Sequence, residues 1–145
     1  MREVIIFVAL AFPLAFAGCS CKEDKVVGTW KITKYENTKK PDEKLTDCDM
    51  ALEFIFSEEA SERKLGSAEA KKLIIKKGKK PCDIKPCMGE PYESRWMVAG
   101  GKLQVGSVCL TVNNFSGVLD FVELGDKKMV LNFFDRLKLT FERVK

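Results

Sequence analysis

From residue 26 onward, apolar and polar positions alternate along the chain with a period of two. In the first such stretch, 26–33, one face carries Val26, Gly28, Trp30 and Ile32, while the other carries Thr29, Lys31 and Thr33. This alternation is typical of a β-strand with one buried face. Eight further segments show apolar strand patterns, at 51–56, 73–75, 92–98, 103–105, 108–112, 118–124, 129–134 and 137–144. The pattern predicts an all-β domain of about eight to nine short strands.

Short turn signals separate these segments. Gly100-Gly101 supplies the positive φ angles that a tight hairpin needs, and Gly125-Asp126 and Asp135-Arg136 mark two further turns. Only 57–71 has a helical composition, so we expect at most one short helix. Short strands joined by tight turns indicate an antiparallel up-and-down barrel or a sandwich.

The first residues of the sequence predict a targeting signal. An apolar run of fourteen residues, 4–17, follows Met1-Arg2-Glu3. It is too short to span a bilayer as a helix and is typical of a signal-peptide core. The run ends at Ala17-Gly18-Cys19, which resembles the lipobox that bacteria cut before a cysteine that becomes lipidated. We therefore expect a signal peptide at 1–18, a lipidated Cys19 with a tether over 19–25, and a folded domain over 26–145.

A second cleavage site is present in the same segment. Ala15-Phe16-Ala17 fits the A-x-A pattern of ordinary secretion, and its use would give a soluble secreted protein. Both alternatives place the domain outside the cytosol. The lipoprotein alternative, which we favour, attaches it to a membrane at the outer membrane or cell surface.

Composition and charge exclude several classes of protein. The 25 basic and 21 acidic residues leave a net charge of +4, which is too small and too mixed to indicate a nucleic-acid binder. The chain has no histidine, which excludes Ser-His-Asp and Cys-His catalysis and His-ligated metals. Asp120 and Glu123 are three positions apart on an expected strand, so they face opposite sides and cannot act as a pair. The sequence predicts a protein that is not an enzyme and needs no metal or cofactor.

Several motifs carry a family resemblance. Val27-Gly28-Thr29-Trp30-Lys31 resembles the G-x-W signature of lipocalins and fatty-acid-binding proteins. The features that follow are similar to those of small lipocalin-like lipoproteins of bacterial envelopes: Asp47-Cys48, an apolar strand at 52–56, a Trp strand and hairpin at 96–102, and Thr140-Phe141-Glu142-Arg143. The resemblance implies a lipocalin-like antiparallel up-and-down barrel.

The last strand predicts a structural pair. Leu137, Leu139, Phe141 and Arg143 share one face, so the arginine ends an apolar row and caps the rim of the core. In lipocalins such an arginine stacks on the G-x-W tryptophan. The resemblance therefore pairs Arg143 with Trp30, a cation–π contact worth about 0.5–2 kcal/mol.

The cysteines are expected to form disulfides in an oxidising compartment. The candidates are Cys48, Cys82, Cys87 and Cys109, and their connectivity does not follow from the sequence. We expect Cys48 to pair with Cys87 or Cys82, which would hold the proline-containing loop 81–91. A metal site at these cysteines is disfavoured because no C-x2-C pair and no histidine is present.

Six lysines surround the apolar segment 73–75: Lys71, Lys72, Lys76, Lys77, Lys79 and Lys80. They either attract anionic headgroups or another polyanion, or they protect a strand edge from pairing with another chain. The second interpretation is favoured.

Two classes of function remain. The leading hypothesis is a monomer that binds a small hydrophobic ligand inside the barrel, lined by Trp30, Ile32, Phe54, Phe56, Trp96, Val98, Leu103 and Phe141. The alternative is a filled barrel that acts through its outer surface, as an interaction or inhibitor module of the cell envelope. An enclosed apolar cavity of about 300 Å³ or more favours the first, and a packed interior favours the second.

Overall fold

The computed structural model describes residues 22–78 and 92–144. These residues form eight β-strands and two short helices, of which the first covers residues 22–26. The other elements are β1 (Gly28–Asn37), α2 (Asp47–Met50), β2 (Glu53–Ala60), β3 (Lys71–Lys76), β4 (Tyr92–Ala99), β5 (Lys102–Cys109), β6 (Asn114–Leu124), β7 (Lys128–Phe133) and β8 (Leu137–Arg143).

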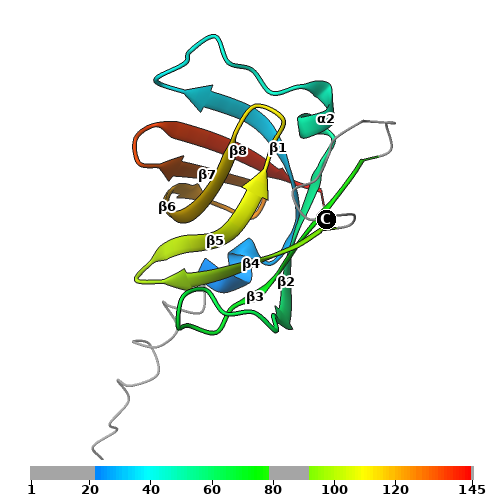
Figure 1. Cartoon of the computed structure of the whole chain (residues 1–145), viewed down its shortest axis with the longest axis vertical. Coiled ribbons are helices and arrows are strands. Elements are labelled where there is room, and N and C mark those ends of the chain that lie inside the picture. The colour runs from blue at the N-terminus through cyan, green and yellow to red at the C-terminus, as the bar shows by residue number, and fades with distance from the viewer. Residues whose placement is uncertain (1–21, 79–91, 145) are drawn as a thin grey trace, which may run out of the picture.

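The strands form a closed antiparallel barrel (Figure 1). Each strand pairs with the next one in the chain, and β8 returns to pair with β1. The predicted all-β up-and-down architecture is therefore confirmed, and the sandwich is excluded. Closure leaves no strand of the barrel with an unpaired edge.

One strand fewer forms than the largest number that the pattern allows. The alternation predicts separate strands over 103–105 and 108–112, but the structure has a single strand, β5. The register between β5 and β6 shifts between Val105 and Val108, around Gly106. A β-bulge interrupts the alternation without ending the strand, and glycine is common at such a bend.

One hairpin turn lies where its sequence signal predicts, and another is shifted from its predicted position. Gly100 and Gly101 have φ of +59° and +74° and join β4 to β5 as predicted. The β7–β8 turn centres one residue earlier than the predicted Asp135-Arg136 bend, because Arg136 N–H donates to the Phe133 carbonyl at 3.0 Å. Phe134 and Asp135 therefore occupy the central positions, with φ of +50° and +52°.

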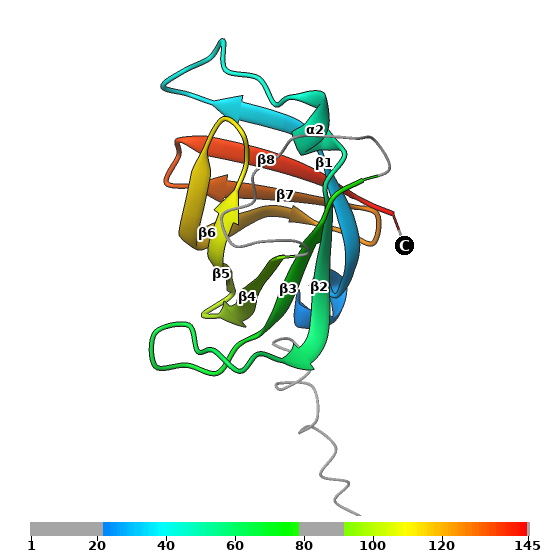
Figure 2. The same ribbon diagram turned by 45° about the vertical axis from the view of Figure 1, so that its right-hand side comes forward.

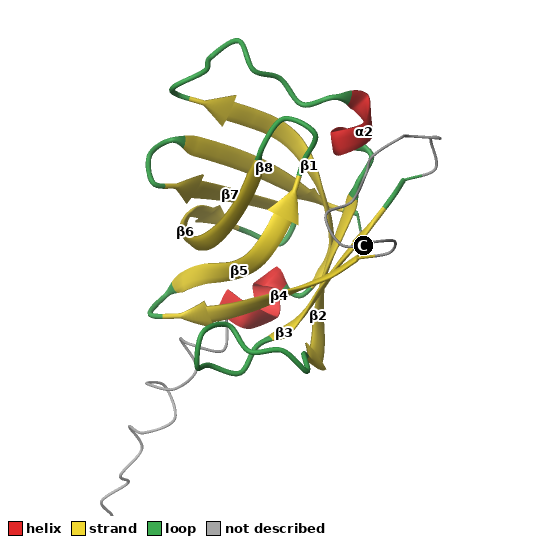
Figure 3. Cartoon of the chain, viewed as in Figure 1, coloured by secondary structure: helices red, strands yellow, loops and turns green. Residues whose placement is uncertain are grey.

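The helices are not where the composition predicts one. Residues 57–71 form no helix, because β2 continues to Ala60 and Ser61 N–H donates to the Ala70 carbonyl at 2.8 Å. The helices lie instead at 22–26 and at α2 (Figure 3). Residues 22–25, which fall in the segment expected to form the tether, are thus helical, and Val26 is fully buried.

The lysines around β3 do not protect a sheet edge. β3 pairs with β2 on one side and with β4 on the other, so it has no edge to protect. Lys72 instead forms an ion pair with Glu59, at 3.4 Å. Lys79 and Lys80 lie outside the described residues.

The two ends of the barrel differ in what covers them. The N-terminal end carries the 22–26 helix and the β2–β3, β4–β5 and β6–β7 connections. The α2 end carries α2 and the β5–β6 and β7–β8 connections. The antiparallel meander places these connections alternately at the two ends, so each strand links one end to the other.

Candidate functional site

The barrel interior is the candidate site that the sequence predicts, and the structure turns all eight predicted lining residues into the core. Seven of them are at most 2 % exposed: Trp30, Ile32, Phe54, Phe56, Trp96, Leu103 and Phe141. Val98 is partly buried and packs against the same cluster. A side chain beside a void large enough for water would have a measurable accessible surface, and these seven side chains have almost none. These residues are packed against one another rather than arranged around an open space.

The aromatic residues pack edge to face across the interior. The Phe54 and Phe141 rings lie 5.4 Å apart at 90°, and the Phe56 and Trp96 rings lie 5.5 Å apart at 81°. Each such pair adds about 0.5–1.5 kcal/mol to what the buried area alone provides. An apolar ligand in this part of the barrel would have to displace these contacts.

Arg143 closes the interior at the N-terminal end. Its guanidinium lies over the Trp30 ring, with 4.2 Å between the Cζ atom and the ring centroid. Its Nη1 donates to the Val27 carbonyl at 2.7 Å, Nε donates to the Asp126 carbonyl at 2.6 Å, and Nη2 donates to the Lys25 carbonyl. The structure thus brings together the two residues that the lipocalin resemblance pairs.

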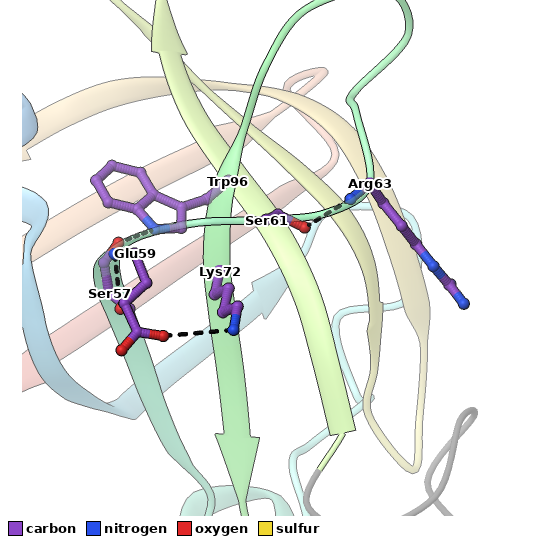
Figure 4. A network of polar contacts seen from close by, with 6 residues as sticks. All are labelled: Ser57, Glu59, Ser61, Arg63, Lys72 and Trp96. Atoms are coloured by element: carbon purple, nitrogen blue, oxygen red, sulfur yellow. Dashed lines mark hydrogen bonds and ion pairs between the residues drawn. The ribbon is translucent and has the colours of Figure 1, made fainter.

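Trp96 is held from the β2–β3 side (Figure 4). Its Nε1 donates to the Ser57 carbonyl at 3.0 Å, and the Lys71 ammonium lies 5.5 Å from the centroid of its ring. Ser57 Oγ also accepts from the Glu59 N–H at 3.0 Å, and the Glu59 carboxylate pairs with Lys72. The polar residues of β2 and β3 therefore position the tryptophan and leave its indole N–H satisfied.

A polar group on β4 lies inside the barrel without a partner. Ser94 is 3 % exposed, and its Oγ has no hydrogen-bond partner among the described residues. A Cβ added at Gly106 would lie 2.7 Å from that Oγ, so the space beside the hydroxyl is narrow. Two positions earlier on β4, burial raises the pKa of Tyr92 to about 12, and its hydroxyl oxygen accepts from Cys109 N–H at 3.0 Å.

A polar cluster at the α2 end was not predicted from the sequence. The Tyr35 hydroxyl donates to Glu43, Asn37 Nδ2 donates to the same carboxylate at 3.1 Å, and Asn113 Nδ2 lies 3.4 Å from the Tyr35 oxygen. These hydrogen bonds, that from Tyr35 first, hold the pKa of Glu43 below its usual range. Burial and the bond to Glu43 raise the pKa of Tyr35.

Asp49 fastens α2 to the β5–β6 connection. Its carboxylate is fully buried and accepts from Thr46 N–H at 3.1 Å, Thr46 Oγ1 at 3.0 Å and Thr111 N–H at 2.8 Å, and also from Thr111 Oγ1. Four hydrogen bonds thus reach this carboxylate, three at Oδ2 and one at Oδ1, and a buried charge is stable only when it is hydrogen-bonded in this way. The Thr46-x-x-Asp49 spacing is a capping box, and this was the signal in the sequence that could have predicted it.

The cysteines lie partly outside the described residues. Cys48 and Cys109 are each disulfide-bonded, and Cys48 packs against the core. Cys19, Cys82 and Cys87 lie outside the described residues. The predicted pairing of Cys48 with Cys87 or Cys82 therefore stays a prediction, as does the lipidation of Cys19.

An open hollow of about 470 Å³ lies at the N-terminal end, lined by Lys127, Glu142, Arg143 and Val144. The guanidinium of Arg143 already donates to three carbonyls, so it is not free to hold a ligand there. In the parts of the chain that the structure describes, no three Cys, Asp or Glu side chains gather as a metal site would require. Within those same parts, no helix has the length and apolar character that a membrane crossing requires.

These features define an eight-stranded antiparallel β-barrel with a packed apolar interior and an arginine-capped end, consistent with a lipocalin-like fold. The chain matches no family model, no curated protein and no solved structure in comparisons with each.

Proposed function

We propose that this protein is a lipocalin-like envelope lipoprotein that acts through the outer surface of a filled barrel, as an interaction or inhibitor module. The observation that carries the proposal is the packing of the predicted ligand-lining residues, seven of which are at most 2 % exposed. A barrel of eight strands is just wide enough to be filled by side chains or to hold one small ligand. Here two tryptophans and four phenylalanines belong to the buried core that fills it.

The experiment compares the wild-type protein with a variant that has an artificial cavity. Leu103→Ala removes the side chain of a fully buried residue and should leave a void that small apolar molecules enter. Native mass spectrometry of the purified wild-type protein should show no lipid-sized adduct other than acyl chains attached covalently to Cys19. Benzene should raise the melting temperature of Leu103→Ala and leave that of the wild type unchanged. A noncovalent lipid-sized adduct on the wild-type protein, one that is lost under denaturing conditions, would contradict the proposal.

The proposal includes attachment to a membrane through Cys19. It is supported by the apolar run at 4–17, by the lipobox-like Ala17-Gly18-Cys19, and by the start of the fold at the 22–26 helix, shortly after that cysteine. Two or more acyl chains on one residue give stable anchoring. Mass analysis of the mature protein should find acylated Cys19 as its first residue, and Cys19→Ser should release the protein from membranes. An unmodified Gly18 at the N-terminus would instead support soluble secretion.

A second candidate function is the binding of a small hydrophobic ligand that carries a hydrogen-bonding group. The observation that favours it is the buried Ser94 hydroxyl, which lacks a partner in the described chain. Such a group is unfavourable unless something satisfies it. If a ligand does so, Ser94→Ala should remove the adduct that native mass spectrometry detects on the wild-type protein.

A further inference from the structure

The turn between β7 and β8 exposes an aromatic side chain. Phe134 is 76 % exposed, more than any other large apolar residue in the described chain, while Val122 at 57 % comes next. Figure 2 shows this turn at the left of the barrel, between the ends of β7 and β8. Exposure of one apolar residue is ordinary in itself, so the backbone at this position matters.

Phe134 also has an unfavourable backbone conformation. Its φ of +50° lies in the left-handed region, and so does that of Asp135, at +52°. A two-residue turn of this kind strongly favours Asn, Asp or Gly, because bulky side chains are strained there. The aromatic residue is therefore unfavourable in two independent ways, by its exposure and by its backbone conformation. Such outliers are concentrated at functional sites.

The contact between Phe134 and Phe133 does not explain why a phenylalanine occupies position 134. Its ring lies 4.6 Å from the Phe133 ring, which itself lies 6.1 Å from Phe115. Phe133 and Phe115 already pack against one another without the third ring. The Phe134 ring extends this aromatic row outward, where most of its surface meets water.

The turn has exposed cations beside it. Thr38 Oγ1 donates to the Asp135 carbonyl at 3.1 Å, which places Lys39 and Lys40 next to Arg136. Within the described chain, no ion pair involves these three cations. The nearby carboxylates are hydrogen-bonded to other groups, since Asp135 accepts from Asn132 and Glu43 accepts from Tyr35. After the hydrogen bonds from Tyr35 and Asn37, the charges of Lys40 and Arg136 also help to lower the pKa of Glu43, although neither cation forms an ion pair with it. Over 34–44 and 134–138, six cations stand against four anions.

We propose that the β7–β8 turn is a protein-docking tip, in which Phe134 enters an apolar pocket of a partner protein. Carboxylates at the rim of that pocket pair with Lys39, Lys40 and Arg136. This inference rests on the proposed function, because it names the part of the outer surface that makes the contact. An exposed aromatic residue with arginine nearby is typical of the residues that dominate binding energy at protein interfaces.

The position of the tip favours a protein over a lipid surface. The tip lies at the α2 end of β8, whereas Arg143 at the other end of that strand contacts the chain near the proposed anchor. Seven residues of β-strand separate the two ends by about 20 Å. The tip therefore points away from the membrane that the anchor would occupy.

The first test separates a binding role from a structural one. Phe134→Asn replaces the strained residue by one that the left-handed region accepts, and Phe134→Tyr retains the ring. If Phe134 is retained for binding, the melting temperature of Phe134→Asn should stay equal or rise by about 2–4 °C. A fall of more than about 3 °C would show that the contact with Phe133 explains the residue, and would overturn the proposal.

The second test identifies what the tip contacts. The photo-crosslinking residue p-benzoylphenylalanine is placed at position 134 of the full-length protein in the cells that make it, and at exposed Val122 as the matched control. A discrete protein adduct is expected at 134 and not at 122. A lipid adduct, no adduct, or the same adduct at both positions would overturn the proposal.

The partner protein that the crosslink captures is then identified and purified. Its affinity is measured for the wild-type protein and for variants that carry no crosslinker. Phe134→Asn should weaken binding at least about tenfold, while Phe134→Tyr stays within about threefold of the wild type. Arg136→Glu should also weaken binding, and added salt should reduce the wild-type affinity. Equal affinity of wild type and Phe134→Asn would overturn the proposal that the β7–β8 turn is the docking tip, and would leave the proposed function standing. A ligand inside the barrel would overturn the proposed function.

Discussion

Replacement of Arg143 tests how much the cap contributes to the stability of the barrel. The guanidinium makes one cation–π contact with Trp30 and three hydrogen bonds to carbonyl oxygens, of which only the bond to Val27 is partly buried. We assign about 1 kcal/mol to the cation–π contact, about 1 kcal/mol to the Val27 bond and about 0.5 kcal/mol to each exposed bond. Arg143→Ala should therefore lower the free energy of unfolding by about 3 kcal/mol, or the melting temperature by about 10 °C.

A lysine at the same position separates the two contributions. Arg143→Lys keeps a cation over Trp30 but can satisfy only one of the three carbonyls with its single ammonium group. We expect a loss of about 1.5 kcal/mol, half of that for alanine. Urea denaturation followed by tryptophan fluorescence measures both values, with exposed Lys138→Ala on the same strand as the control. If Arg143→Ala costs less than about 1 kcal/mol, the cap does not stabilise the barrel as argued here.

Three further predictions concern groups inside the fold and at its α2 end. Asp49→Ala should lower the free energy of unfolding by about 3 kcal/mol in urea denaturation, because four part-buried hydrogen bonds to its carboxylate are lost, and an effect below about 1 kcal/mol would contradict this. Tyr35→Phe should raise the pKa of Glu43 toward its ordinary value, as measured by NMR titration of the side-chain carboxyl. The folded pKa of Glu43 is depressed, so its contribution to stability is present above the unfolded pKa and is lost as the pH falls through the folded pKa. The free energy of unfolding of Tyr35→Phe should therefore depend less on pH in this acidic range than that of the wild type. Gly106→Ala should cost about 1–3 kcal/mol because the new Cβ meets the Ser94 hydroxyl, and Ser94→Ala in the same chain should recover part of this loss; equal costs with and without the serine would refute the clash.

The fold was predictable because it depends on a local pattern. Outside the β-bulges, inward and outward positions alternate along the strands, so most of the apolar faces and the position of Arg143 at the end of its row follow from spacing alone. The barrel, the Gly100-Gly101 hairpin and the buried lining residues all express this period. The strands pair in the order in which they follow one another along the chain, so the topology required almost no information beyond that order.

What the sequence did not predict depends on departures from that period. The β-bulge between Ile32 and Lys34 shifts the alternation in β1, so Tyr35 turns toward the core although unbroken spacing would place it outside. The same effect at Gly106 joined two predicted strands into one. Phe134-Asp135 lacks the Asn-Gly signature of a two-residue turn, so its left-handed conformation could only be seen in the structure.

The pairing of β8 with β1 fixes the order in which the barrel can be completed. Strand β1 begins near residue 28 and finds its second neighbour only in the last strand of the chain. Synthesis must therefore finish before the seam can form, and until then the first strand has an unpaired side. In a nascent chain of this topology the barrel therefore stays open throughout elongation and closes only after β8 has been made.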